Sequence, residues 1–195
     1  MRIIAFILIS LFTNAVFSAE HTIPNFEEFV RAQETPATCW AAANRMLLAS
    51  KGIEVSEESQ LRKVFGSVYP RGAGGDFSMA QRGLKGTFEA NDGTRYRVRP
   101  YVSYRVQQRM GDADWVIKSL LDGRPLVTTD GQHGYVIYGA QWQERGGLIY
   151  ITGIRVIDPM HRFDPVGHPV LQWYLPTHPL YQHLIGFMGF EIESM

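Results

Sequence analysis

The sequence predicts a single domain of the α+β class. Helical patterns with start and stop residues occupy much of the first half, whereas from Pro125 onward short apolar segments read mainly as strands. The chain has 195 residues, of which 45% are hydrophobic, and this suits one domain with a sizeable core. We therefore expect helices packed against a sheet, with an active cleft between the two halves.

The first residues have the pattern of an export signal. Arg2 precedes an apolar run from Ile3 to Phe12, and small residues follow as far as Ala19. Ten apolar residues are too few for a membrane-spanning helix, which needs about 20. We expect cleavage after Ser18, which leaves a mature domain of residues 19–195 in the periplasm or outside the cell. The alternative is a buried N-terminal helix.

Four helices are predicted in the first half of the mature chain. They run from Phe26 to about Ala32, from Cys39 to about Ser50, from Glu57 to Gly66, and from Asp76 to Leu84. Asn25 and Glu28 have the spacing of a capping box before the first helix. The second follows a turn at residues 36–38, and its alanines suit burial on most sides. Ser56 is the expected N-cap of the third, and Gly66 its end.

Strands and one further helix are predicted after a loop at residues 70–75. The expected strands are Thr87–Ala90, Arg95–Val102, Leu126–Thr129, Tyr135–Tyr138, Leu148–Val156 and Leu184–Ile192. The first two flank Asn91-Asp92-Gly93, a strong signal for a hairpin turn. Asp112 is the expected cap of a helix over 113–122, and Gly123 its end.

The charge and the cysteine count exclude several classes of protein. Lys plus Arg total 19 and Asp plus Glu total 19, so the chain lacks the strong positive charge of nucleic-acid proteins. Removing Arg2 with the signal leaves 18 against 19, a net charge of −1. Cys39 is the only cysteine, which excludes an intramolecular disulfide and a multi-cysteine metal site. We expect a monomer that binds neither nucleic acid nor, after signal cleavage, a membrane.

The lone thiol has two interpretations. In an exported protein an unpaired cysteine is a candidate for a reactive group. The alternative is a buried cysteine that behaves as a small hydrophobic residue. Cys39 begins its helix, where free N–H groups and the helix dipole favour the thiolate. Gln33 lies on the preceding loop, where its side-chain amide could donate to an oxyanion.

A base and an orienting acid are available further along the chain. His133 lies two residues before Tyr135, where an apolar strand begins, and Asp158 lies at the end of the next long strand. Antiparallel neighbours would bring these two side chains together. Asp130 and Asp164 are alternatives to Asp158.

The remaining candidate features are given structural interpretations. His161 and His168, with Asp164 between them, form a weak metal pattern that we interpret as a surface loop. No metal or organic cofactor is expected. Trp40 is expected to pack beside the cleft.

The arrangement resembles the papain-like cysteine peptidases. The likeness rests on Gln33-x5-Cys39-Trp40 opening an alanine-rich helix, on His133 before an apolar strand, and on Asp158-Pro159. The likeness covers residues 25–192. Within the family, the chain is most similar to compact bacterial members, including the peptidase domains of bacteriocin exporters and secreted effector proteases.

The resemblance implies a helical half packed against an antiparallel sheet, with the active cleft between them. It implies that Cys39 is the nucleophile, His133 the base, Asp158 the orienting acid and Gln33 the oxyanion donor. The substrate would be a peptide or protein, hydrolysed without a cofactor.

Two departures limit the likeness. The spacing from Cys39 to His133 is 94 positions, shorter than in the large plant and lysosomal enzymes, and their Cys-Gly-Ser signature before the nucleophile is missing. Their peptide specificity therefore does not carry over. Alternative functions are a cell-wall amidase or a transglutaminase-like acyl transferase using the same site, and a non-catalytic binding or immunity protein on this scaffold.

Overall fold

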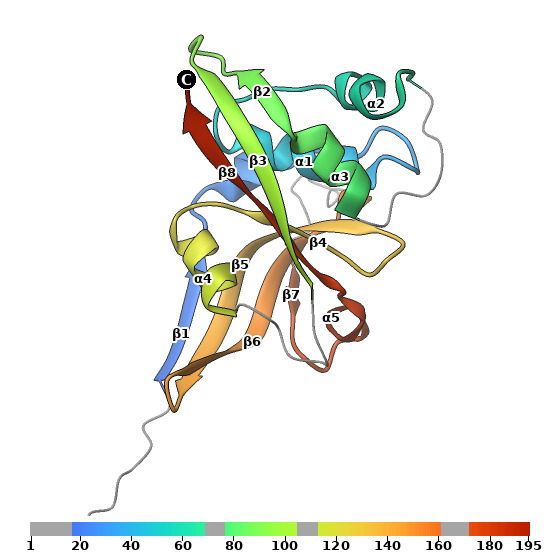
Figure 1. The fold of residues 1–195 in the computed structure, drawn as a ribbon. Coiled ribbons are helices and arrows are strands. Elements are labelled where there is room, and N and C mark those ends of the chain that lie inside the picture. The colour runs from blue at the N-terminus through green and yellow to red at the C-terminus, as the bar shows by residue number, and fades with distance from the viewer. Residues whose placement is uncertain (1–16, 69–76, 105–112, 161–171) are drawn as a thin grey trace, which may run out of the picture.

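The computed structural model describes residues 17–68, 77–104, 113–160 and 172–195, which form five α-helices, one 3-10 helix and eight strands (Figure 1). The helices are η1 (Phe26–Phe29), α1 (Cys39–Ala49), α2 (Glu57–Phe65), α3 (Phe77–Leu84), α4 (Ala113–Leu121) and α5 (Pro179–His183). The strands are β1 (Phe17–Thr22), β2 (Gly86–Glu89), β3 (Arg95–Tyr104), β4 (Leu126–Thr129), β5 (Gly134–Arg145), β6 (Leu148–Ile157), β7 (Gln172–Tyr174) and β8 (Gly186–Ser194). In these described segments, no helix is long and apolar enough to span a membrane.

The strands form one antiparallel sheet, so the predicted α+β class is confirmed. Its order is β2-β3-β8-β4-β5-β6-β7, and β1 pairs with β5 outside this path. Every residue of β3 except Arg95 pairs with β8, from Tyr96 opposite Ser194 to Tyr104 opposite Gly186. The sheet therefore joins strands from both halves of the chain, and the separation expected between a helical half and a strand half holds only in outline.

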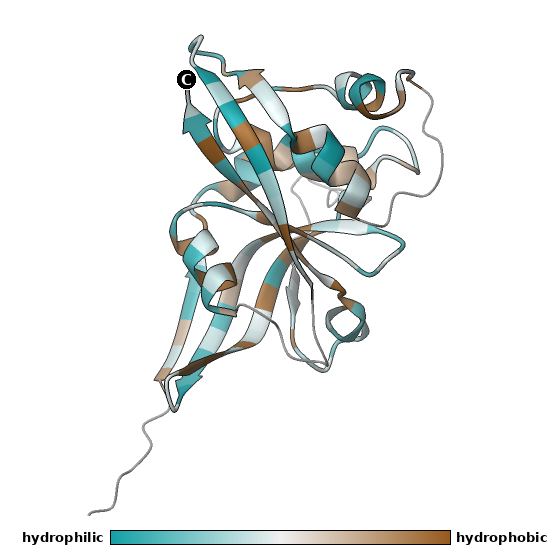
Figure 2. Ribbon diagram, viewed as in Figure 1, coloured by the Kyte–Doolittle hydropathy of each residue, from teal (hydrophilic) through white to brown (hydrophobic). Residues whose placement is uncertain are grey.

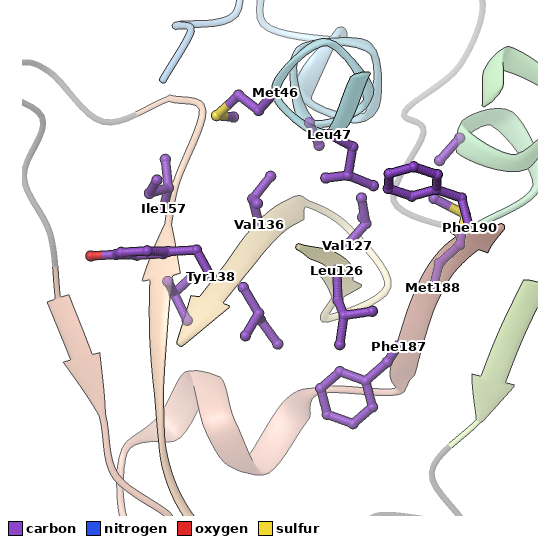
Figure 3. Packing of buried hydrophobic residues seen from close by; sticks show 14 of the residues in the cluster. Met46, Leu47, Leu126, Val127, Val136, Tyr138, Ile157, Phe187, Met188 and Phe190 are labelled. Atoms are coloured by element: carbon purple, nitrogen blue, oxygen red, sulfur yellow. The ribbon is translucent and has the colours of Figure 1, made fainter. Parts of the chain in front are cut away.

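Helices cover both faces of the central strands. Met46 and Leu47 of α1 point toward Val127 and Val136 on one face (Figure 3). On the other face, the side chains of Trp115 of α4 and Leu126 of β4 both lie close to Gly189. Every residue of β4 is buried, as expected for a strand covered on both sides. Burying each large apolar side chain contributes roughly 1.5–3 kcal/mol, so packing, more than helix propensity, holds α1 in place.

Most of the local signals in the sequence lead to the expected elements. The Ser56 hydroxyl accepts a hydrogen bond from the N–H of Ser59 at 3.0 Å and caps α2. Gly66 ends this helix in the left-handed conformation, at φ 72°. The hairpin of β2 and β3 forms around the Asn-Asp-Gly turn, and polar and apolar residues alternate along β3 (Figure 2).

The predicted helix from Phe26 to Ala32 is wrong in extent. Only a 3-10 turn forms, and Asn25 adopts a left-handed conformation (φ 55°) without a side-chain cap. Phe26 is fully buried and its ring stacks on that of Tyr138 at 5.4 Å. The position of this segment is consequently set by docking of one aromatic side chain.

Three elements were not predicted, namely β1, β7 and α5. β1 pairs with the second part of β5, from Phe17 opposite Glu144 to Thr22 opposite Gly139. A Cβ atom on Gly139 would lie 2.8 Å from the Thr22 hydroxyl oxygen, so glycine permits this close approach. Cleavage after Ser18 would leave four of the six residues of β1, from Ala19 to Thr22.

Candidate active site

The thiol lies where the central helix meets the sheet. Cys39 is the first residue of α1 and is only 3% exposed. The N–H of Gly134, at the start of β5, donates to its sulfur at 3.4 Å. The preceding Thr38 is fully buried and accepts from the N–H groups of Ala41 and Ala42 through its carbonyl oxygen. The packing of α1 on the sheet thus fixes the sulfur beside β5.

His133 and Asp158 meet across neighbouring strands, as the sequence predicted. His133 ends the loop between β4 and β5, and Asp158 directly follows β6. Because β5 and β6 are antiparallel, with Val136 opposite Ile157, the two side chains lie at the same end of the sheet. The Nε2 atom of His133 is 2.6 Å from Oδ1 of Asp158.

The imidazole also contacts the thiol, so the three side chains form a continuous chain. His133 is close enough to Cys39 for the thiol and the imidazole to shift each other's pKa. Because Nε2 is engaged by Asp158, Nδ1 is the ring nitrogen left for the sulfur. The Asp158 carboxylate is itself held by the N–H of Met160, which donates to Oδ1 at 2.8 Å. Both His133 and Asp158 are largely buried, with side chains 15% and 18% exposed.

The electrostatics favour a thiolate–imidazolium pair. Burial alone would raise the pKa of Cys39, but the hydrogen bond and charge of His133, with the N–H groups of Gly134 and Trp40, bring it below the ordinary value of 9.0. Burial alone would lower the pKa of His133, but hydrogen bonds to Asp158 and Cys39 raise it to about 9. Each partner therefore stabilises the charged form of the other.

Gln33 lies beside the acid, on the loop that enters α1. Its backbone N–H donates to the carbonyl oxygen of Pro159 at 2.9 Å. Its side-chain amide donates to the carbonyl oxygen of Thr35 at 2.7 Å. Among the contacts of the described residues, none joins the Gln33 side chain to Cys39. An amide nitrogen carries two N–H donors, so one is left for a further acceptor.

Glu57 supports the same loop, a role that no pattern in the sequence predicts. We placed Glu57 in the first turn of α2, where acids are normally solvated, yet it is 1% exposed. Its two carboxylate oxygens each accept from the N–H of Glu34 at 3.1 Å. Nη1 of Arg45 lies 3.4 Å from Oε1, and the nearby Thr38 side chain lowers the pKa of the carboxyl group. Burial raises the pKa of Glu57, and these hydrogen bonds partly offset the effect.

A second buried polar contact joins α1 to α2 and α3. The Asn44 amide donates to Oε1 of Gln60 at 2.9 Å and to the carbonyl oxygen of Ala80 at 3.0 Å. Gly83 leaves room for this contact, because a Cβ there would lie 2.4 Å from the Gln60 oxygen. Trp40 is buried against Gly83 and the Phe65 ring, within the helical layer.

The remaining predicted residues are placed as follows. Asp130, the alternative to Asp158, binds the backbone of His133 and not its ring: Oδ1 accepts from the His133 N–H at 2.8 Å. Asp164, His161 and His168 lie outside the described residues. Within the described ranges, no group of three or more His, Cys, Asp or Glu could hold a metal ion.

This arrangement can activate a sulfur nucleophile and move one proton. The thiolate is the reactive form of cysteine, and an imidazolium beside it can protonate a leaving group. A carboxylate on the second ring nitrogen fixes the tautomer and the orientation of the ring.

Comparison with models of known protein families gave no match, and a search of the curated proteins also gave none.

Proposed function

We propose that the protein is an exported cysteine peptidase that hydrolyses peptide or amide bonds through Cys39, His133 and Asp158. One observation carries the proposal: Nε2 of His133 lies 2.6 Å from Oδ1 of Asp158, while the same imidazole interacts with the Cys39 thiol. The lowered pKa of the thiol and the raised pKa of the imidazole support it. The resemblance to papain-like peptidases points to the same three residues.

The reaction follows from the charges in the resting site. The Cys39 thiolate attacks the carbonyl carbon of the substrate and forms a carbon–sulfur bond, with a negative charge on the carbonyl oxygen. When the tetrahedral intermediate collapses, the carbon–nitrogen bond breaks and Nδ1 of His133 gives its proton to the leaving amine. The product is a thioester on Cys39.

Water completes the cycle. His133, now neutral, removes a proton from a water molecule as its oxygen attacks the thioester carbonyl. The carbon–sulfur bond breaks, the acid product leaves, and the thiolate–imidazolium pair is restored. Asp158 keeps Nε2 in its donor role throughout.

Gln33 is the proposed side-chain donor to the oxyanion, together with the N–H of Cys39. One N–H of the Gln33 amide is bound to the carbonyl oxygen of Thr35, so the second N–H would donate to the oxyanion. Removing one such donor typically slows turnover about 100-fold or more. We expect Q33A to lower kcat by this order while leaving KM nearly unchanged.

The proposal is tested with a fluorescently labelled, denatured protein as a broad substrate. Wild type should release labelled peptides, and the C39S variant should release none above background. Matching circular dichroism spectra and melting temperatures would show that C39S is folded. Hydrolysis that persists in C39S would overturn the assignment of the nucleophile.

Two parallel assays identify other acyl-transfer chemistry at the same site. Release of peptide from purified peptidoglycan without protein hydrolysis would indicate a cell-wall amidase. Release of ammonia with incorporation of an added amine would indicate a transglutaminase-like transferase. A Cys39 that is inert in all three assays and reacts slowly with iodoacetamide would indicate a non-catalytic protein.

A further inference from the structure

A pocket of about 470 Å³ lies against the loop that ends at His133. Among the described residues it is lined by Asp130 and Gln132 from the loop between β4 and β5, and by Leu180 and His183 from α5. The backbone N–H of Ile185, just after α5, donates to the carbonyl oxygen of Thr129 at 2.9 Å and ties the two walls together. The pocket is thus built from the loop that carries the proposed base.

Asp130 is held rigidly in this wall. Its Oδ1 atom accepts from the N–H of Gln132 at 2.9 Å and from the N–H of His133 at 2.8 Å. Its Oδ2 atom accepts from the Tyr135 hydroxyl at 3.2 Å. Each carboxylate oxygen offers about two lone-pair sites, so Oδ1 is filled while Oδ2 retains one.

The negative charge of Asp130 acts on its surroundings. Burial and then the charges of Asp130 and Asp158 raise the pKa of Tyr135. The ion pairs among the described residues do not include Asp130. The carboxylate therefore presents a fixed charge and one vacant acceptor site in a pocket wall that is bonded to the backbone of His133.

We propose that this pocket is a specificity subsite for a cationic side chain, lysine or arginine, of a substrate residue close to the cleaved bond. An ammonium or guanidinium N–H would donate to Oδ2 of Asp130. The methylene stem would pack on Leu180, while the side-chain oxygen of Gln132 and a ring nitrogen of His183 are further acceptors. This inference rests on the proposed function, because it treats the neighbouring site as the place of hydrolysis.

A positional peptide series tests the subsite. Peptides would be identical except for arginine, lysine, norleucine or glutamate at one of the two positions on either side of the cleaved bond. At one position we expect kcat/KM for arginine and lysine to exceed that for norleucine about tenfold, the size of a charge-assisted hydrogen bond, and glutamate to rank last. Equal rates at every position would overturn the proposal.

A matched pair of variants assigns the preference to Asp130. D130N removes the charge but keeps an oxygen for the N–H groups of Gln132 and His133. It should bring the ratio of arginine to norleucine rates to within about twofold. D114N, which alters an exposed acid on α4, should keep the wild-type ratio. A basic preference that survives in D130N would contradict the assignment.

A binding measurement separates failure of the subsite from failure of the proposed function. The C39A protein, labelled with nitrogen-15, is titrated with N-acetyl-arginine methylamide and with its norleucine counterpart. The arginine compound alone should shift the amide signals of Gly131 and Gln132. If these shifts occur in C39A but the wild-type protein hydrolyses no peptide, the proposed pocket is supported and the proposed function is wrong. If neither compound shifts them, the subsite is wrong.

Discussion

Replacing His133 by alanine should slow the reaction of Cys39 with iodoacetamide at pH 7. In the native site the hydrogen bond and charge of His133 keep the pKa of the thiol below 9.0, against the opposing effect of burial. Without the imidazole, burial remains and the pKa returns at least to that ordinary value. The thiol is only 3% exposed, so little solvent is available to compensate.

The size of the effect follows from the fraction of thiolate. A thiol with its ordinary pKa of 9.0 is about 1% ionised at pH 7, so a fully ionised Cys39 would lose about 100-fold of its thiolate if its pKa returned to that value. A thiolate of higher pKa is more nucleophilic, by a factor of roughly three for each pKa unit. The two effects oppose each other, and together they predict that H133A reacts several-fold more slowly than wild type.

The assay is direct because the chain contains one cysteine. Intact-mass measurements under excess reagent give the rate of a single adduct. H178N is the matched control, since it removes an exposed imidazole but keeps a side chain that can cap α5. If H133A reacts as fast as wild type, or H178N is slowed equally, the ion-pair assignment is wrong.

Three further variants test the support of the site. G83A should destabilise the fold by about 1–3 kcal/mol in urea unfolding, because the new Cβ would lie 2.4 Å from the Gln60 oxygen. Q81A, in the same helix, should unfold at the same urea concentration as wild type. If G83A is as stable as wild type, the packing argument is refuted. E57Q should cost about 1–3 kcal/mol, since the NH2 group of glutamine cannot accept from the Glu34 N–H as the second carboxylate oxygen does. The exposed E58Q should change stability by less than about 0.5 kcal/mol. D158N should move the basic limb of the kcat/KM profile from near pH 9 to lower pH, because Asp158 helps His133 keep its proton up to that pH; an unmoved limb would show that Asp158 does not set the pKa of the base.

The elements that the sequence predicted well are those with local signals. Ser56 and Gly66 mark the ends of α2 through their own conformations and hydrogen bonds, which need no distant partner. β1 gave no such signal, because its place is set by pairing with β5 and by the space at Gly139. β7 has three residues and α5 five, too few for a hydrophobic period to appear.

The residues that support the candidate site could not be predicted either, because their roles also depend on contacts with distant parts of the chain. Cys39, His133 and Asp158 each stand at the end of an element, so their order along the chain already indicated that they meet. Glu57 and Asn44 contribute through burial, which depends on how α1, α2 and α3 pack together. A carboxylate in the first turn of a helix has the same local pattern whether it is solvated or, like Glu57, 1% exposed.

The contact between His133 and Asp158 depends on the register of the sheet. Val136 stands opposite Ile157, so Asp158 continues β6 at the level of the residues just after His133. A slip of one residue would turn Asp158 to the opposite face, because successive side chains of a strand alternate. The order of residues along the chain can suggest that these two side chains meet. The packing of β5 and β6 against α1 and α4 selects the register in which they do, and with it the ring nitrogen that faces the thiol.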